Sequence, residues 1–117
     1  MARILAVDDE KAILRLYQRL LTREGYEVVT ANDGLEGVET YQRSPDFATV
    51  ITDIGMPRAS GLYVIEEIRK INTDQRILVV ASCSNEDLQR ARELGISGFL
   101  AKPFGDGSSL VRLVKGL

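Results

Sequence analysis

The chain has 117 residues, of which 44% are hydrophobic and 27% charged, the usual balance of a globular domain with one core. Fifteen Lys and Arg against seventeen Asp and Glu give a formal net charge of -2, so we expect no direct binding to nucleic acid. One cysteine, no signal peptide and no long apolar run predict a cytoplasmic protein that does not enter a membrane. Histidine is absent, so carboxylates, hydroxyls and lysine must carry any chemistry.

Short apolar runs rich in β-branched residues alternate along the chain with segments of helical periodicity. The apolar runs predict five strands, at residues 4–7, 26–31, 48–52, 77–81 and 98–101. The segments between them predict five helices, one that contains residues 13–21 and ends at Gly25, and others at 35–43, 62–71, 86–94 and 108–115. Repeated βα units with short connections favour a parallel sheet with helices on both faces. We therefore predict one doubly wound α/β domain over residues 1–117.

Polar residues follow most of the predicted strands, where the ligands of such sheets bind. The first strand is followed by Asp8, Asp9 and Glu10, and three later strands are followed by Asp53, Ser82 and Lys102. The second strand instead ends in Asn32, Asp33 and Gly34, which are typical turn residues. Because the other four ends could converge on one edge of the sheet, we expect a functional site there.

The chemistry of this set points to a metal ion and a phosphoryl group. Aspartates held close together repel one another unless a proton or a cation neutralises them. Carboxylate and carbonyl oxygens, without histidine or paired thiols, favour Mg²⁺ over zinc. Lys102 and the Ser82 hydroxyl can donate to phosphoryl oxygens, and a carboxylate can form an aspartyl phosphate. The residues therefore suit phosphoryl transfer.

Each of these residues also has an ordinary structural interpretation. The acidic residues 8–10 could cap and charge the N-terminus of the first helix. Asp53 could be a turn residue, Ser82 a cap of the fourth helix, and Lys102 a solvated lysine before Pro103. Their shared position at strand ends favours the functional interpretation. We assign Cys83 no role, because an inert buried thiol is the simpler interpretation.

These motifs resemble those of the receiver domain of two-component response regulators, over nearly the whole chain. Residues 7–10 (VDDE) resemble the acidic pair after the first strand, residues 53–57 (DIGMP) the phosphoacceptor and its loop, and residues 102–104 (KPF) the lysine motif. Ser82 stands at the position of the family's hydroxyl residue. The resemblance implies the flavodoxin-like strand order 2-1-3-4-5 and a cis peptide bond before Pro103.

The resemblance also implies individual roles for the site residues. Asp53 would be the phosphorylated nucleophile, and Asp9 and Asp53 would bind Mg²⁺ directly. Asp8 would act through water, and the carbonyl oxygen of Gly55 would complete the protein ligands. The donor would be the phosphohistidine of a partner histidine kinase or phosphotransfer protein, with Mg²⁺ and Lys102 balancing charge during in-line transfer. The domain would catalyse only its own phosphorylation and dephosphorylation.

Switching, by the same resemblance, would draw Ser82 toward the phosphoryl group and move Phe99 inward. This would change the face formed by the fourth helix, the fifth strand and the fifth helix, which would act on a downstream effector domain or protein and could support a homodimer on phosphorylation. Phe99 could instead serve only in packing. Gly55 and Ser84 occupy the positions that tune attack by water, and neither offers a carboxylate or an amide, which predicts an aspartyl phosphate of moderate to long lifetime.

Three other functions compete with this interpretation. An aspartate-nucleophile phosphatase would carry a second aspartate two residues after the nucleophile, where this chain has Gly55, and a cap segment over a substrate pocket. A flavodoxin-like electron carrier would offer hydroxyls and amides to the FMN phosphate, where this chain offers carboxylates. A receiver-like adaptor that acts without phosphorylation is the remaining alternative, because only chemistry separates it from a phosphoacceptor.

Overall fold

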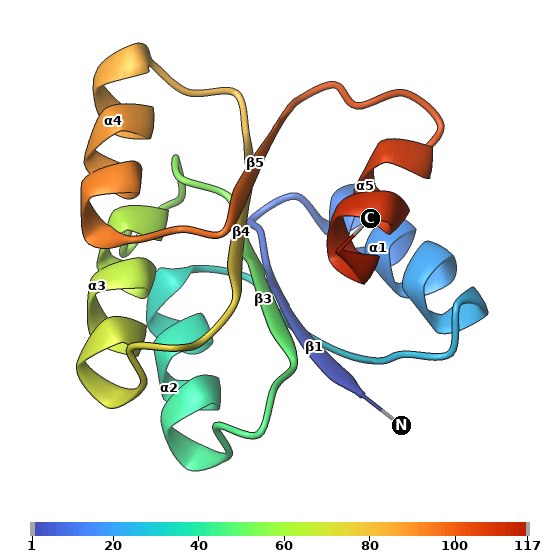
Figure 1. Cartoon of the computed structure of the whole chain (residues 1–117), viewed down its shortest axis with the longest axis horizontal. Helices are drawn as coiled ribbons and strands as arrows, with labels where there is room; N and C mark the ends of the chain where they lie inside the picture. Colours follow the sequence, from blue (N-terminus) through green and yellow to red (C-terminus); the bar gives the residue numbers. More distant parts are fainter. Residues whose placement is uncertain (1, 117) are drawn as a thin grey trace.

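The computed structural model describes residues 2–116, which fold into a five-stranded parallel sheet between two layers of helices (Figure 1). Strands and helices alternate along the chain: β1 (Arg3–Val7), α1 (Lys11–Arg23), β2 (Glu27–Ala31), α2 (Gly34–Arg43), β3 (Thr49–Thr52), α3 (Gly61–Ile71), β4 (Ile77–Ala81), α4 (Asn85–Leu94), β5 (Gly98–Ala101) and α5 (Ser108–Lys115). The strand order is β2-β1-β3-β4-β5, with every neighbouring pair parallel. The predicted fold class and strand order are confirmed.

Each face of the sheet carries its own hydrophobic layer. Helices α1 and α5 cover one face, and α2, α3 and α4 cover the other (Figure 1). The periodic apolar residues of α1, Leu14, Tyr17 and Leu21, are buried in the first layer. Strands β1, β3 and β4 are almost entirely buried, whereas the edge strands β2 and β5 are partly exposed. Within residues 2–116, no helix has the length and apolar character needed to cross a membrane.

The strand register brings the functional edge together. In the pairing of β1 with β3, Val7 lies opposite Thr52, and the N–H of Asp53 donates to the carbonyl oxygen of Val7 at 3.0 Å. Asp8 and Asp53 therefore leave two adjacent strands side by side. On the other side of β3, the N–H of Lys102 donates to the carbonyl oxygen of Ala81 at 3.1 Å as β5 ends. This edge is where the winding of the sheet reverses, the usual ligand position in such folds.

Gly61, the first residue of α3, fixes the helix against the backbone of Asp53. A Cβ atom added at Gly61 would lie 1.9 Å from the carbonyl oxygen of Asp53. We expect Gly61→Ala to lower the free energy of unfolding by about 1–3 kcal/mol, the usual cost of overpacking. Urea unfolding followed by circular dichroism would measure this loss.

Gly55→Ala is the matched control, because a Cβ added at Gly55 would meet no atom within 4 Å. Its free energy of unfolding should change by less than about 0.5 kcal/mol. Equal losses in the two variants would contradict the explanation by close packing.

Candidate functional site

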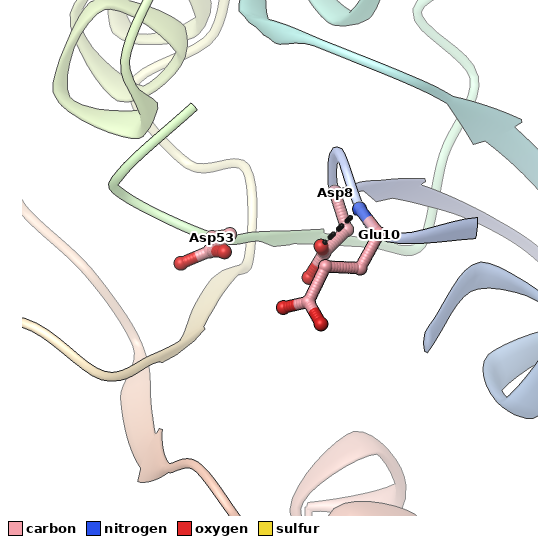
Figure 2. Close-up of side chains that lie close together, drawn as sticks. All are labelled: Asp8, Glu10 and Asp53. Carbon is pink, nitrogen blue, oxygen red and sulfur yellow. Dashed lines mark hydrogen bonds between the residues drawn. The ribbon is translucent and has the colours of Figure 1, made fainter. Parts of the chain in front are cut away.

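Four charged side chains meet beyond the carboxyl ends of β1, β3 and β5. The Nζ atom of Lys102 donates to Oδ2 of Asp8 at 2.7 Å, to Oδ2 of Asp53 at 3.1 Å and to Oε1 of Glu10 at 3.3 Å. One carboxylate oxygen from each of the three acids lies within 4.8 Å of the others (Figure 2). The tertiary structure thus brings together four residues of the set expected at this edge, Asp8, Glu10, Asp53 and Lys102.

Backbone amides orient the two buried aspartates. The N–H of Glu10 donates to Oδ1 of Asp8 at 2.9 Å, and the N–H of Ile54 donates to Oδ1 of Asp53 at 2.7 Å. Asp8 is fully buried and Asp53 is 8% exposed. Because an amide holds Oδ1 in each case, Oδ2 of both aspartates is the atom that meets Lys102. The two carboxylates are therefore held at a fixed position before any ligand arrives.

The charges of the site do not cancel. Burial raises the pKa of Asp8, although hydrogen bonds from Lys102 and from the N–H of Glu10 oppose this. Burial also disfavours the ammonium group of Lys102, but hydrogen bonds and charges of Asp8 and Asp53 outweigh it and raise the pKa of the lysine. Three carboxylates surround one ammonium group, so the site favours a further cation.

The oxygen atoms of this site fit a hard divalent cation. Mg²⁺ prefers carboxylate oxygens and keeps several waters, and Glu10, with an exposed side chain, leaves the site open to solvent. Asp9, expected from the resemblance as a direct ligand, is exposed and lies outside the group formed by Asp8, Glu10 and Asp53. Its role as a ligand stays a prediction.

Glu10 belongs to the acidic run of residues 8–10, but the resemblance implies no role of its own for it. Its backbone is extended, with φ of -92° and ψ of 109°. The carboxylates of Asp8 and Glu10 both accept from Lys102 and lie close to that of Asp53, whereas Asp9 is exposed. The chain bends at Asp9, so no local repeat in the sequence distinguishes Glu10 from Asp9.

The structure decides several of the ordinary interpretations. The side chain of Glu10, the N-cap residue of α1, makes no capping hydrogen bond, so the capping interpretation is wrong for Glu10. The helix cap of α4 is Ser84, whose Oγ accepts from the N–H of Asp87 at 3.1 Å, so Ser82 is not that cap. Lys102 has a side chain only 12% exposed and is not a solvated lysine. Asp33 caps α2, in agreement with the turn interpretation of its segment.

Ser82 lies beside the charged cluster at the edge of a hollow of about 490 Å³ between α1 and the segment that follows β5. The residues around this hollow are Glu10, Ile13, Leu16, Ser82, Lys102, Pro103, Phe104 and Gly105. The peptide bond between Lys102 and Pro103 is cis, as the resemblance implied. The site thus opens into a space with charged groups at one side and apolar groups around the rest.

Gly55 and Phe99, two further residues selected from the sequence, lie outside the group of charged side chains. Gly55 is exposed in the loop that follows Asp53. Its role as a carbonyl ligand of Mg²⁺ stays a prediction. Phe99 is half-buried in β5 and packs against the hydrophobic layer under α2, α3 and α4. This position agrees with a packing role for Phe99, and its role in switching stays a prediction.

The fold and the site together define a flavodoxin-like domain with a carboxylate and lysine cluster suited to phosphoryl chemistry. The family described as response regulator receiver domain matches residues 4–115. The chain belongs to this family, and it is a signalling receiver domain of the two-component type rather than a classical enzyme.

Relatives and solved structures agree with this assignment. The chain is 34% identical to the chemotaxis protein CheY of Treponema pallidum, over 98% of this chain and 82% of that protein. It is also 34% identical to a CpxR homolog of Haemophilus influenzae, over 97% of this chain but 49% of that protein. The response regulator TrrA of Thermotoga maritima, solved in complex with Mg²⁺ and BeF, is 35% identical with a TM-score of 0.89, over 99% of this chain and 98% of that chain.

The comparisons bear on the competing functions and on the extent of the protein. Membership of the receiver family disfavours the phosphatase, the electron carrier and the adaptor that acts without phosphorylation. The chain spans about half the length of the transcriptional regulators that it matches.

Proposed function

We propose that this domain accepts a phosphoryl group on Asp53 from the phosphohistidine of a partner kinase or phosphotransfer protein. The observation that carries the proposal is the contact of Lys102 with Oδ2 of Asp53 at 3.1 Å, beside the fully buried Asp8. The complex of TrrA with Mg²⁺ and BeF, a fluoride that imitates a phosphoryl group, gives independent support from a relative.

The contacts of Asp53 support different roles for its two carboxylate oxygens. The N–H of Ile54 holds Oδ1 of Asp53, so Oδ2 attacks the phosphorus atom. As the new O–P bond forms, the P–N bond of the phosphohistidine breaks, and the imidazole leaves with the electron pair. Attack by a carboxylate removes no proton from the nucleophile, so no general base is needed, in agreement with a chain that contains no histidine. Lys102 then stabilises the transferred negative charge.

Bound Mg²⁺ would supply positive charge that stabilises the phosphoryl group during transfer. We propose the ligand set that the resemblance implied, with Asp9, Asp53 and the carbonyl oxygen of Gly55 as direct ligands and Asp8 acting through water. The excess of negative charge around Lys102 supports a dication here.

The hollow beside the site suits the phosphodonor partner. Ile13 and Leu16 of α1 and the segment of Pro103 and Phe104 give it apolar walls, and Lys102 lies at its charged side. An apolar helix face placed against these walls would bring a histidine of the partner toward Asp53. We place the partner kinase or phosphotransfer protein on this surface.

The proposed output is a change in the face formed by α4, β5 and α5. Ser82 and Phe99 would carry the change from Asp53 to this face, and a downstream effector, in the same polypeptide or separate, would respond to it. A homodimer on phosphorylation and a cytoplasmic location belong to the same proposal. The domain would catalyse its own phosphorylation and dephosphorylation, with no contact of its own to nucleic acid.

Phe99→Ala tests the proposed output. We expect this variant to be phosphorylated at the wild-type rate, because Phe99 packs in the hydrophobic layer under α2, α3 and α4 and makes none of the hydrogen bonds of the charged cluster. NMR amide shifts in α4, β5 and α5 on addition of Mg²⁺ and beryllofluoride should be at least halved relative to the wild-type protein. Tyr63→Ala, which removes an exposed aromatic ring from α3, is the control and should keep the full shifts. Unreduced shifts in Phe99→Ala would show that Phe99 serves only in packing.

Intact-mass spectrometry after incubation with acetyl phosphate and Mg²⁺ tests the proposed function directly. We expect a gain of one phosphoryl group per chain, with none when a chelator removes the metal. Peptide mapping should place the group in the segment that contains Asp53. An unchanged mass in the presence of Mg²⁺ would favour the receiver-like adaptor.

A further inference from the structure

The ammonium group of Lys102 has no free donor in this structure. Its acceptors are Oδ2 of Asp8 at 2.7 Å, Oδ2 of Asp53 at 3.1 Å and Oε1 of Glu10 at 3.3 Å. A lysine ammonium group has three N–H bonds and therefore three donors in all. Lys102 must release one of these carboxylates before it can donate to a phosphoryl oxygen.

The three acceptors differ in how easily they can be released. Asp8 is fully buried, so losing Lys102 would leave a buried carboxylate oxygen without a donor, which is costly. Asp53 is the group that reacts, and its side chain is 10% exposed. The side chain of Glu10 is 60% exposed and makes the longest of the three contacts, so water can replace the lysine there at little cost.

The backbone keeps Glu10 in position for this contact. Its N–H donates to Oδ1 of Asp8 at 2.9 Å, and its carbonyl oxygen accepts from the N–H groups of Ile13 and Leu14 at the start of α1. Figure 2 shows the carboxylate of Glu10 turned toward the space that it shares with Asp8 and Asp53. The backbone of Glu10 is therefore held at both its N–H and its carbonyl oxygen, and its side chain reaches Lys102 from this fixed position.

We propose that Glu10 is a positioning residue, which holds the third donor of Lys102 in the unphosphorylated domain and yields it to the incoming phosphoryl group. The inference rests on the proposed phosphorylation of Asp53. Glu10 competes with the phosphoryl group for Lys102, and its negative charge also opposes an anionic donor. Glu10 therefore slows phosphorylation and weakens the binding of phosphoryl analogues, in contrast to a residue that only supports the fold.

The test compares the wild-type chain with Glu10→Gln and Glu10→Ala, at Mg²⁺ concentrations that saturate each protein. The rate of phosphorylation by acetyl phosphate is followed by intact mass, and the affinity for beryllofluoride by ¹⁹F NMR. Both variants should show rates and affinities about two- to fivefold above the wild-type values, the size expected for losing a partly exposed ionic competitor. Glu39→Gln, an exposed glutamate of α2, is the matched control and should leave both values unchanged.

The rates and affinities of the two Glu10 variants test the proposed role of this residue. Rates or affinities at or below the wild-type values in either Glu10 variant would overturn the inference, as would loss of folding in both variants, which would make Glu10 a structural residue. Agreement between the Gln and Ala variants would show that the charge of Glu10 matters rather than its bulk. A wild-type chain that gains no phosphoryl group would instead refute the proposed function itself.

Discussion

Asp53→Asn is expected to gain no phosphoryl group under conditions that add one to each wild-type chain. The asparagine keeps the size of the side chain, and its oxygen can still accept from the N–H of Ile54, as Oδ1 of Asp53 does at 2.7 Å. The position that faces Lys102 becomes an amide group, which is uncharged and a very weak nucleophile. Intact-mass spectrometry with acetyl phosphate and Mg²⁺ measures the loss.

Asp46→Asn is the matched control, because Asp46 is an exposed aspartate in the loop before β3, away from the charged cluster. It should gain the phosphoryl group at the wild-type rate. If Asp53→Asn were phosphorylated as fast as the control, the acceptor would be another residue, and Asp8 and Ser82 would be the first to examine by peptide mapping.

Lys102→Met is expected to weaken both the fold and the reaction. The substitution leaves the carboxylates of Asp8 and Asp53 buried without their common cation. In the presence of a chelator, we expect the free energy of unfolding to fall by about 2–4 kcal/mol, somewhat less than the usual cost of breaking a fully buried pair because Glu10 and water reach the site. Mg²⁺ should restore part of this loss, because it replaces the missing positive charge.

The rate of phosphorylation should fall by a larger factor than the stability of the fold. Lys102 is the donor that stabilises charge on the transferred phosphoryl group, so phosphorylation by acetyl phosphate should slow by about 10²- to 10³-fold at saturating Mg²⁺. Lys70→Met is the control, because Lys70 forms an exposed ion pair with Glu67 on α3. Its urea midpoint and its rate of phosphorylation should match the wild-type values. A rate for Lys102→Met within threefold of wild type would refute the role of the lysine.

The same lysine predicts how stability depends on pH. Pairing raises the pKa of Lys102 in the folded chain above its ordinary value of 10.5. Below that value the ammonium group is charged in both states and its contribution is fully present. The contribution is lost as the pH rises through the folded pKa, because the folded state then holds a proton that the unfolded state has released.

Urea unfolding at increasing pH measures this effect. The wild-type chain should lose stability above pH 10.5, and Lys102→Met should lose less over the same range. Burial also raises the pKa of Tyr17, which lowers stability at high pH in both proteins, so the comparison depends on the difference between them. Identical pH profiles would show that the ion pairs of Lys102 do not stabilise the fold.

The site holds more acidic than basic groups, so the contacts of Lys102 leave negative charge that a cationic ligand can neutralise. Asp8 is buried where its raised pKa shows that the charged form is disfavoured. Its carboxylate is nevertheless kept at a fixed distance from Asp53, ready for a cation and a phosphoryl group. In the unliganded domain the carboxylates repel one another. A cation that neutralises this repulsion binds more tightly as a result.

Local patterns in the sequence determined the elements of this protein and the edge at which its site lies. A strand or a helix repeats at a fixed period, so its buried residues recur at that period in the sequence. The apolar runs and the helical periodicity therefore predicted the bounds of the strands and helices closely. The position of Asp8, Asp53, Ser82 and Lys102 after strands then followed, because parallel strands present all their carboxyl ends at one edge.

Only the tertiary structure decided which side chains meet within that edge. Lys102 reaches Asp8 across 94 positions of sequence and Asp53 across 49, and no local repeat relates such distant residues. The inclusion of Glu10 rather than Asp9 depends on the backbone dihedrals at the start of α1, which set the direction of each side chain. The direction of a side chain and its distance from residues far away in the sequence are set by the packing of the whole chain. They decide which of the acidic residues form the site.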